Sequence, residues 1–315
     1  MTSQPPPRSR FAPLVQGGAA FGGLFHPVDP DQVQQALETA WELGLRAFDT
    51  APHYGVGRSE ELVGRFLRTK PRDEFVLSTK VGRLLVDDPD APTEGEGYVA
   101  TPHRRRVPDY TADGVRRSLD ASLERLGLDR VDVALVHDPE DHLDTAVREA
   151  APALAELRSQ GVLGGFGVGT NFSATAERFV AETDLDHLLL AGRYTLLERG
   201  PAETLLPACA EHGVAVLAAG VFNSGLLVDP TAAGARYNYV EAPADIVARA
   251  QRMEAACTRA GVSLRAAAVQ FPARHPAVTA VVLGAGSAAE VRDSWEQLQV
   301  PVPESLWGEL ADLAG

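Results

Sequence analysis

The sequence has few cysteines, few aromatic residues and no long hydrophobic run. Its two cysteines, Cys209 and Cys257, form no Cys-x-x-Cys pair and have no zinc-type spacing. This argues against a disulfide framework and a cysteine-based metal site, and it indicates a reducing, cytoplasmic location. No stretch reaches the roughly 18 unbroken apolar residues of a membrane helix. The N-terminal residues also lack the apolar core of a secretory signal, so we expect neither membrane insertion nor secretion.

Positive charge is also scarce. The 43 acidic residues exceed the 29 basic ones and give a net charge of −14, which argues against nucleic acid as a general partner. Only Lys70 and Lys80 among the basic residues are lysines. A buried lysine can change its protonation state near neutral pH, whereas an arginine stays charged. Lys80 ends an apolar run, so it is a candidate for a functional role.

Short apolar runs alternate with longer amphipathic stretches along the whole chain. The expected strands are Ala12–Val15, Leu45–Asp49, Phe75–Lys80, Val131–His137, Leu163–Gly167, His187–Gly192, Val214–Ala219 and Val278–Leu283. The expected helices are Asp31–Leu43, Gly57–Leu67, Ala112–Leu126, Asp144–Gln160, Ala174–Glu182, Ala202–His212, Asp245–Gly261, Ser287–Leu298 and Ser305–Leu313. This alternation predicts a parallel sheet covered by helices, and eight strands favour a closed (β/α)8 TIM barrel. The first strand is not followed by Gly-x-Gly-x-x-Gly, so a Rossmann domain is the weaker interpretation.

Two connections are longer than the rest, over residues 82–110 and 220–244. In a barrel both would lie at the C-terminal rim, where active sites are found, and long loops there are often functional or mobile. We expect residues 1–10 to form a disordered tail and residues 11–315 to form one catalytic barrel domain.

Four chemically distinct side chains follow three successive expected strands: Asp49, Tyr54, Lys80 and His137. The C-terminal ends of barrel strands share one rim, so these groups are expected to meet there. A phenol is a poor base alone, but a nearby ammonium favours the phenolate. We therefore expect Lys80 to lower the pKa of Tyr54, Asp49 to hold Lys80, and His137 to orient the substrate oxygen. Each residue taken singly has an ordinary structural interpretation, as a cap, an ion-pair partner or a core histidine.

Two other chemistries remain open at this rim. The run His137–His142 contains two histidines and three acids that could be interpreted as a metal site, but neighbouring loop residues point apart, so we expect no metal. Lys80 could also act as a Schiff-base nucleophile of a lyase. Tyr54 and Asp49 beside the amine favour proton transfer over that alternative.

The segments Phe48–Gly55 with Ser59 and Glu60, Ser78–Lys80 and Leu135–Asp138 resemble the landmark motifs of the aldo-keto reductase family. The resemblance extends over about residues 12–300. It implies a TIM barrel, a nicotinamide cofactor bound without a Rossmann domain, and a catalytic tetrad of Asp49, Tyr54, Lys80 and His137.

Three further segments, Gly167–Asn171, Ala191–Glu198 and Gly220–Leu226, look like the D-threo-aldose 1-dehydrogenase group of that family, which includes L-fucose dehydrogenases and a pyridoxal 4-dehydrogenase. The resemblance implies hydride transfer from the C1 hemiacetal of an aldose to NAD(P), giving a lactone. The alternatives are a pyridoxal 4-dehydrogenase, a general aldehyde or ketone reductase, and a cofactor-binding regulatory subunit. We expect a small sugar or aldehyde substrate and a monomer or homodimer.

The same resemblance implies where the cofactor binds. Its expected contacts are Thr170, Asn171, Arg193, Phe222, Gly284, Gly286, Ser287 and Glu290. The segment after the eighth strand has no base at the positions that relatives use for the 2′-phosphate of NADP, and it has an added carboxylate at Glu290, so NAD is favoured over NADP. Expected substrate contacts are His53, Tyr110, Asn223 and Tyr237.

Overall fold

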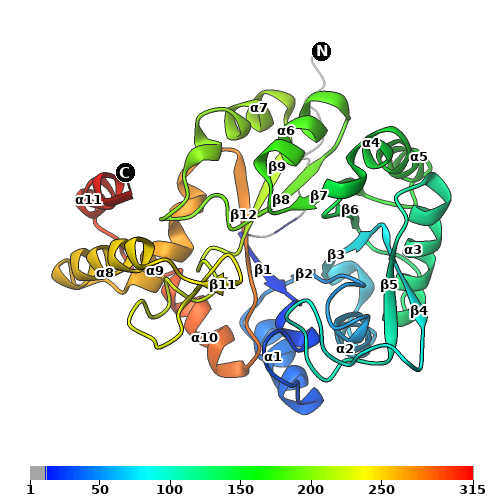
Figure 1. Cartoon of the computed structure of the whole chain (residues 1–315), viewed down its shortest axis with the longest axis horizontal. Helices are drawn as coiled ribbons and strands as arrows, with labels where there is room; N and C mark the ends of the chain where they lie inside the picture. The colour runs from blue at the N-terminus through cyan, green and yellow to red at the C-terminus, as the bar shows by residue number, and fades with distance from the viewer. Residues whose placement is uncertain (1–10, 12, 315) are drawn as a thin grey trace.

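The computed structural model describes residue 11 and residues 13–314, and these residues form a (β/α)8 barrel (Figure 1). Eight parallel strands close into a ring in the order β1-β12-β9-β8-β7-β6-β3-β2. Their bounds are Leu14–Gly17 (β1), Ala47–Asp49 (β2), Val76–Val81 (β3), Val133–His137 (β6), Gly165–Thr170 (β7), His187–Ala191 (β8), Ala215–Ala219 (β9) and Val278–Leu283 (β12). The predicted barrel is confirmed. The expected tail over residues 1–10 and the first residue of the first expected strand, Ala12, lie outside the described residues.

Two layers of apolar side chains hold the barrel together. Val15, Leu135, Leu189 and Leu217 belong to a small cluster inside the ring, and the larger cluster lies between the strands and the helices. Because the strands are covered on both faces, they read as continuous apolar runs rather than as alternating patterns. β7 is longer than expected: it extends to Thr170, three residues beyond the expected end at Gly167.

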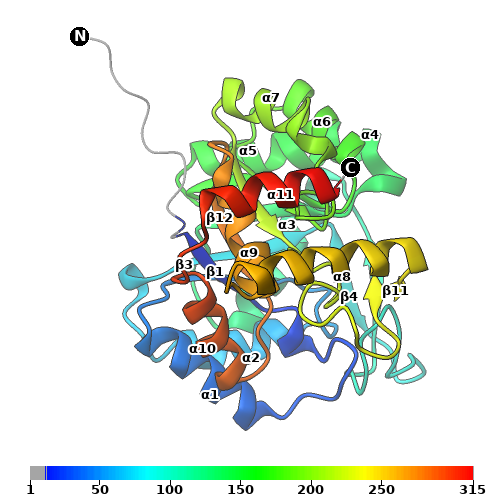
Figure 2. The same cartoon turned by 90° about the vertical axis from the view of Figure 1, so that its left-hand side faces the viewer.

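The main helices follow the strands as the spacing predicted. Their bounds are Pro30–Glu42 (α1), Arg58–Leu67 (α2), Ala112–Leu126 (α3), Ser173–Glu182 (α6), Leu205–His212 (α7), Ala244–Arg259 (α8), Ala288–Gln297 (α10) and Glu304–Ala314 (α11). α3 shows why such predictions succeed. Thr111 caps its N-terminus by accepting the Gly114 N–H at 3.1 Å, and Gly127 ends it at φ 63°. α11 lies alongside α8 on the outside of the barrel (Figure 2).

The single helix expected over residues 144–160 has three parts: Leu143–Thr145 (α4), a π-helical turn over Ala146–Ala150, and Ala151–Ser159 (α5). Pro152 follows the π turn, and proline cannot donate the helical hydrogen bond at its position. A short helix, Leu264–Gln270 (α9), was not expected.

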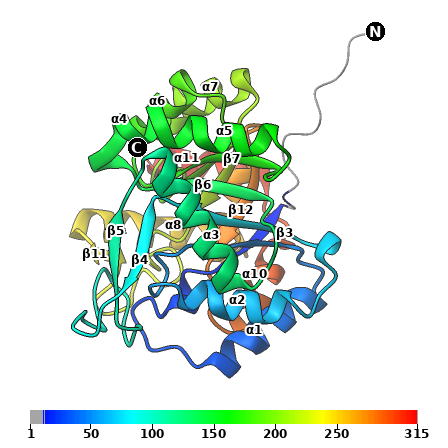
Figure 3. The same ribbon diagram turned by 90° about the vertical axis from the view of Figure 1, so that its right-hand side faces the viewer.

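Both long connections contain antiparallel hairpins that were expected only as loops. Arg83–Asp87 (β4) pairs with Arg104–Pro108 (β5), and Arg236–Tyr237 (β10) pairs with Val240–Glu241 (β11). Figure 3 shows both hairpins on the same side of the barrel, although they come from distant parts of the chain. They therefore flank the same rim.

Among the described residues, no helix combines the length and apolarity needed to span a membrane. Cys209 and Cys257 are buried free thiols, and burial raises their pKa values to about 12 and about 11.

Candidate active site

Lys80 lies at the centre of the polar cluster at the C-terminal ends of β2, β3 and β6. Its Nζ donates hydrogen bonds to Asp49 Oδ2 at 2.6 Å, to Tyr54 Oη at 2.9 Å and to the Thr50 carbonyl at 3.1 Å. Lys80 is 1% exposed and Asp49 is 2% exposed. An ammonium has three donors, and all three are used here, so the geometry describes a charged Lys80 rather than a free amine available for a Schiff base.

The loop after β2 holds this arrangement in place. Ser78 Oγ donates to the second oxygen of Asp49 at 2.8 Å, which fixes the carboxylate from the other side. Gly55 directly follows Tyr54 at φ 63°, and a Cβ there would lie 2.1 Å from the Gly22 carbonyl oxygen. Only glycine fits at this position, so the Tyr54 loop is pressed against the loop that follows β1.

Burial controls the protonation of Tyr54. It raises the pKa of this phenol well above 10, and the negative charges of Asp49 and Asp138 act in the same direction. The net direction is therefore opposite to the lowering expected from Lys80, because burial of the phenol is the largest cause and the nearby Asp49 charge adds to it. Since Lys80 donates to Tyr54 Oη, the phenolic proton is free to point into the cavity.

His137 ends β6 beside Tyr54. The two rings are perpendicular, with centroids 5.7 Å apart. Burial and the nearby Lys80 charge lower the pKa of His137 well below 6.5, so the imidazole is neutral at pH 7. Its Nε2 lies 3.4 Å from Asp138 Oδ2, while its buried Nδ1 has no hydrogen-bond partner among the described residues.

A second polar group, from the β4–β5 connection, covers the tetrad. Arg83 Nη1 donates to His53 Nδ1 at 3.0 Å, and burial together with Arg83 lowers the pKa of His53 to about 2. His53 is therefore neutral, and the 3.3 Å approach of Glu96 to the same nitrogen is not an ion pair. Tyr98 stacks on Tyr54 at a centroid distance of 6.3 Å.

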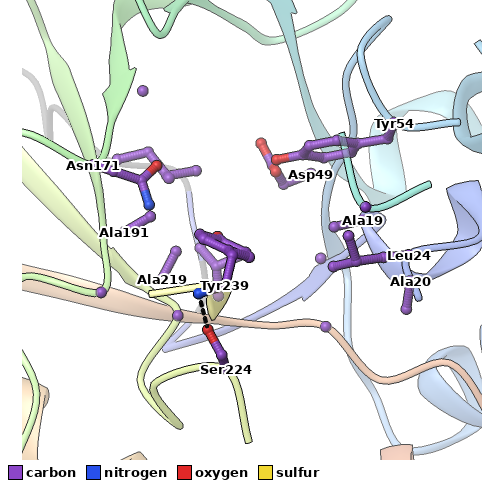
Figure 4. A pocket seen from close by; sticks show the side chains of 18 of the residues that line it. Ala19, Ala20, Leu24, Asp49, Tyr54, Asn171, Ala191, Ala219, Ser224 and Tyr239 are labelled. Atoms are coloured by element: carbon purple, nitrogen blue, oxygen red, sulfur yellow. Dashed lines mark hydrogen bonds between the residues drawn. The ribbon is translucent and has the colours of Figure 1, made fainter. Parts of the chain in front are cut away.

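The tetrad opens into a cavity of about 640 Å³. All four tetrad residues line it. The far walls are formed by small residues at the C-terminal ends of β1, β7, β8, β9 and β12 and just after them: Gly17, Gly18, Ala19, Ala20, Gly169, Ala191, Gly192, Ala219, Gly220 and Gly284. Figure 4 shows Tyr54 and Asn171 on opposite sides of this pocket and Tyr239 between them. A Cβ at Gly169 would lie 3.4 Å from Lys80 Cε, so a larger residue there would narrow the cavity beside Lys80.

Asn223 is an unsatisfied polar group in this wall. It is 2% exposed, and neither amide atom of its side chain has a partner among the described residues. Leaving a buried amide unpaired is costly. A ligand with donors and acceptors, such as the amide and phosphate groups of a dinucleotide, would satisfy it. The glycine-rich walls and this amide fit a nicotinamide cofactor.

Four of the expected cofactor contacts line the cavity: Thr170, Asn171, Phe222 and Gly284. Arg193 does not, because its Nε donates to the Asn171 carbonyl at 2.6 Å and its Nη1 donates to Asn238 Oδ1 at 3.1 Å. It connects the end of β7 to the β10–β11 turn. The Thr170 hydroxyl donates to Glu140 and accepts the Phe172 N–H, so it stabilises the turn after β7.

The other three expected cofactor contacts form the start of α10 and do not line the cavity. Ser287 accepts the Glu290 N–H at 3.3 Å, and the Glu290 carboxylate accepts the Gly286 N–H at 2.7 Å. This is close to a capping box. The Glu290 carboxylate thus accepts the Gly286 backbone N–H, which would otherwise be available to bind an anion.

His53 and Asn223 line the cavity as expected of substrate contacts, whereas Tyr110 and Tyr237 do not. The Tyr110 hydroxyl donates to the carbonyl oxygens of His137 at 2.6 Å and Asp138 at 3.0 Å, so it braces the end of β6 instead. Several polar and aromatic lining residues were not among the expected contacts: Glu96, Tyr98, Asp138, Ser224, Asn238 and Tyr239. Only Asp138 carried a signal, since it ends the His137 motif. No group of three or more metal-ligating side chains occurs in the described part of the chain.

The comparisons with known proteins agree with this geometry. Residues 13–314 match the model of a family described as the aldo/keto reductase family. The chain is 45% identical to a D-threo-aldose 1-dehydrogenase of Pseudomonas sp over 306 residues, which covers 95% of this chain and 93% of that protein. It is 39% identical to a pyridoxal 4-dehydrogenase of Microbacterium luteolum over 316 residues, covering 94% and 92%.

Solved structures with the same fold include an aldo-keto reductase from Bacillus halodurans, with a TM-score of 0.78, 23% identity and coverage of 96% of this chain and 92% of that one. A glycerol dehydrogenase from Gluconobacter oxydans has a TM-score of 0.75 and 24% identity, covering 96% and 91%. At these identities the likeness shows the fold alone.

Proposed function

The chain belongs to the aldo/keto reductase family and is an NAD(P)-dependent oxidoreductase, and we propose that it oxidises the C1 hemiacetal of a cyclic aldose to a lactone. The observation that carries this proposal is the contact of Tyr54 Oη with Lys80 Nζ, at 2.9 Å, in the wall of a cavity of about 640 Å³. The aldose is taken from the relative at 45% identity, a D-threo-aldose 1-dehydrogenase.

The residues at the cavity wall divide into two sets in this proposal. Asn171, Phe222, Asn223 and the glycines at the strand ends hold the dinucleotide, which supplies a hydride acceptor when oxidised. Tyr54 and His137 bind and orient the sugar hydroxyl, while Lys80 holds Tyr54 and Asp49 holds Lys80. Tyr54 exchanges a proton with the reacting oxygen, and neutral His137 hydrogen-bonds to it.

Proton transfer at Tyr54 has a direction set by its environment. A protonated phenol donates readily to a developing alkoxide, which suits reduction. Oxidation needs the phenolate to accept the hydroxyl proton. Because burial raises the pKa of Tyr54 above 10, we expect the oxidation rate to rise with pH between about 7 and 10.

We also propose NAD⁺ as the preferred cofactor. The support is the Glu290 carboxylate at the start of α10, which already accepts the Gly286 N–H and would repel a 2′-phosphate. A single catalytic domain over residues 11–315, a cytoplasmic location and a monomer or homodimer remain predictions from the sequence.

Pyridoxal 4-dehydrogenase activity is the second candidate, because the chain is 39% identical to such an enzyme. Its substrate also forms a cyclic hemiacetal, so the same proton transfer would apply. A general aldehyde reductase would use the same tetrad, but the two relatives compared above are both dehydrogenases. A regulatory subunit has less support, since a regulatory role does not need the complete tetrad.

The test is a panel of L-fucose, D-arabinose, L-galactose and pyridoxal, each with NAD⁺ and NADP⁺, followed by absorbance of the reduced cofactor. Tyr54→Phe should lower kcat by about 10²–10⁴-fold while the dinucleotide Kd stays nearly constant. Tyr194→Phe, which changes a buried tyrosine packed on Phe271, is the matched control and should keep its activity. Turnover of pyridoxal alone would favour the second candidate, and no turnover of any sugar would refute the aldose proposal.

A further inference from the structure

Asp138 lies in a constrained turn directly after His137. Its φ is 41°, in the left-handed region that residues other than glycine, asparagine and aspartate rarely adopt. Its N–H donates to the Gly169 carbonyl at 2.9 Å, and Tyr110 donates to its carbonyl at 3.0 Å. The turn is therefore fixed from two sides.

A glycine makes room for this support. Gly82, at φ 98°, has no side chain, and a Cβ there would lie 2.3 Å from the Tyr110 ring. Strained backbone that the surroundings hold so firmly is typical of functional positions. The consequence here is that the Asp138 side chain is directed to the cavity, which it lines together with His137 and Tyr54.

Only one oxygen of the Asp138 carboxylate is engaged within the described protein. Oδ2 accepts a hydrogen bond from Arg83 Nη2 at 3.1 Å and lies 3.4 Å from His137 Nε2. Oδ1 has no hydrogen-bond partner among residues 11 and 13–314, and the side chain is 26% exposed. An ionised carboxylate offers about four acceptor positions, so this group keeps unused acceptors at the wall of the cavity.

We propose that Asp138 is a specificity-determining residue that accepts a hydrogen bond from the hydroxyl on the carbon next to the reacting carbon. This inference rests on the proposed function, in which Tyr54 and His137 hold the oxygen at C1. The ring neighbours of C1 in a cyclic aldose are the ring oxygen and C2, and only C2 carries a hydroxyl that could donate to a carboxylate beside His137 Nε2. Arg83 balances the charge of Asp138, so a neutral, hydroxylated substrate meets no net charge here.

Asp138 is ionised under ordinary assay conditions. Burial raises its pKa to about 6, although Arg83 acts in the opposite direction. Above pH 7 it is an acceptor only, and it cannot itself serve as the acid for C1. Its expected role is recognition: a site built to bind a hydroxyl rejects the analogue that lacks it.

The experiment compares L-fucose with 2-deoxy-L-fucose in the wild type and in Asp138→Asn. Asparagine tolerates the left-handed backbone and keeps the shape of the side chain, so the variant should fold. For L-fucose we expect kcat/KM to fall by about 10–100-fold in Asp138→Asn, because a neutral amide, whose single acceptor oxygen is drawn to Arg83, replaces the charged acceptor. For 2-deoxy-L-fucose the change should stay within about 3-fold, and the dinucleotide Kd should not change.

Glu96→Gln is the matched control. It removes the same charge from the cavity mouth, but Glu96 is paired with Arg83 and Arg106 and does not approach His137. We expect it to leave the preference for the C2 hydroxyl intact. If Asp138→Asn lowers kcat/KM equally for L-fucose and 2-deoxy-L-fucose, Asp138 only supports the turn or Arg83. The inference is then overturned. If the wild type oxidises neither sugar, the proposed function fails and the inference fails with it.

Discussion

The buried ion pair between Lys80 and Asp49 allows catalysis to be separated from stability. Replacing Lys80 with methionine leaves the Asp49 carboxylate 2% exposed with Ser78 as its remaining side-chain donor. Replacing Asp49 with asparagine removes the charge partner of an ammonium that is 1% exposed. Breaking such a pair from one side costs about 3–5 kcal/mol of unfolding free energy, because an uncompensated charge stays buried.

The double variant Asp49→Asn/Lys80→Met should behave differently. With both charges gone, no uncompensated charge remains, and a buried pair replaced on both sides is often close to neutral in stability. We therefore expect most of the lost unfolding free energy to return. Activity should not return, because Tyr54 has lost the donor at 2.9 Å that holds its oxygen.

Urea denaturation of the four proteins gives the coupling energy, and steady-state turnover gives the activity. A matched control is Arg265→Met/Asp293→Asn, which removes an outer ion pair at 2.7 Å between half-buried side chains and should change both quantities little. If the double variant is as unstable as the sum of its two single variants, the two charges do not act as a pair. If Lys80→Met keeps wild-type turnover, the proposed role of the tetrad is wrong.

Two further predictions concern other parts of the barrel. Glu290→Gln should raise kcat/KM for NADP⁺ relative to NAD⁺ by about 10-fold, because it removes a charge that repels the 2′-phosphate. Glu296→Gln on the same helix is the control and should leave this ratio unchanged. An unchanged ratio in Glu290→Gln would refute the role of Glu290. His187 is 2% exposed, and burial lowers its pKa from 6.5 to about 4, so the stability it gives is complete above pH 6.5 and is lost as pH falls towards 4. In urea titrations, His187→Leu should lose about 3 kcal/mol less unfolding free energy than the wild type as the pH falls from about 6.5 to about 4. Replacing the exposed His26 with glutamine is the control and should not change this loss. An identical pH dependence in the wild type and His187→Leu would contradict the assignment.

The barrel could be predicted from the sequence because its signals are local. All eight barrel strands were expected, and α3 was placed at its observed ends, since its cap at Thr111, its apolar spacing and Gly127 all agree. The tetrad residues were found together for a related reason. A residue at the end of a parallel barrel strand can lie only at one rim, so position in the sequence gives position in space.

The hairpins could not be predicted in the same way. β5 is Arg-Arg-Arg-Val-Pro, which has no apolar alternation, and its arginines are held by partners far away in the chain. Arg104, for example, contacts Asp87 and Glu61. The β10–β11 turn uses Asn238 and Tyr239, both with positive φ, and tyrosine is an unusual residue for that conformation. Glu96, Tyr98 and Tyr239 reach the cavity only through these hairpins, so they were missed too.

The sign of the Tyr54 pKa shift was missed for a different reason. The ammonium of Lys80 was expected to dominate because the sequence shows which charges are present. It does not show that the ammonium is paired at 2.6 Å or how far water is excluded from the phenol. The charge of each side chain follows from its residue type, but the desolvation of the Tyr54 phenol depends on the complete packing around it.

The order of strands in the barrel explains how one cavity can serve two ligands. β2, β3 and β6 are neighbours in the ring, and together with the loop after β2 they carry the four ionisable tetrad residues. The remaining strands, β7, β8, β9, β12 and β1, are also contiguous, and they end in small residues that leave room for a flat ligand. Each half of the rim carries its own hairpin, β4–β5 after β3 and β10–β11 after β9. Substitutions in the first hairpin should therefore act mainly on the sugar, and substitutions in the second mainly on the dinucleotide.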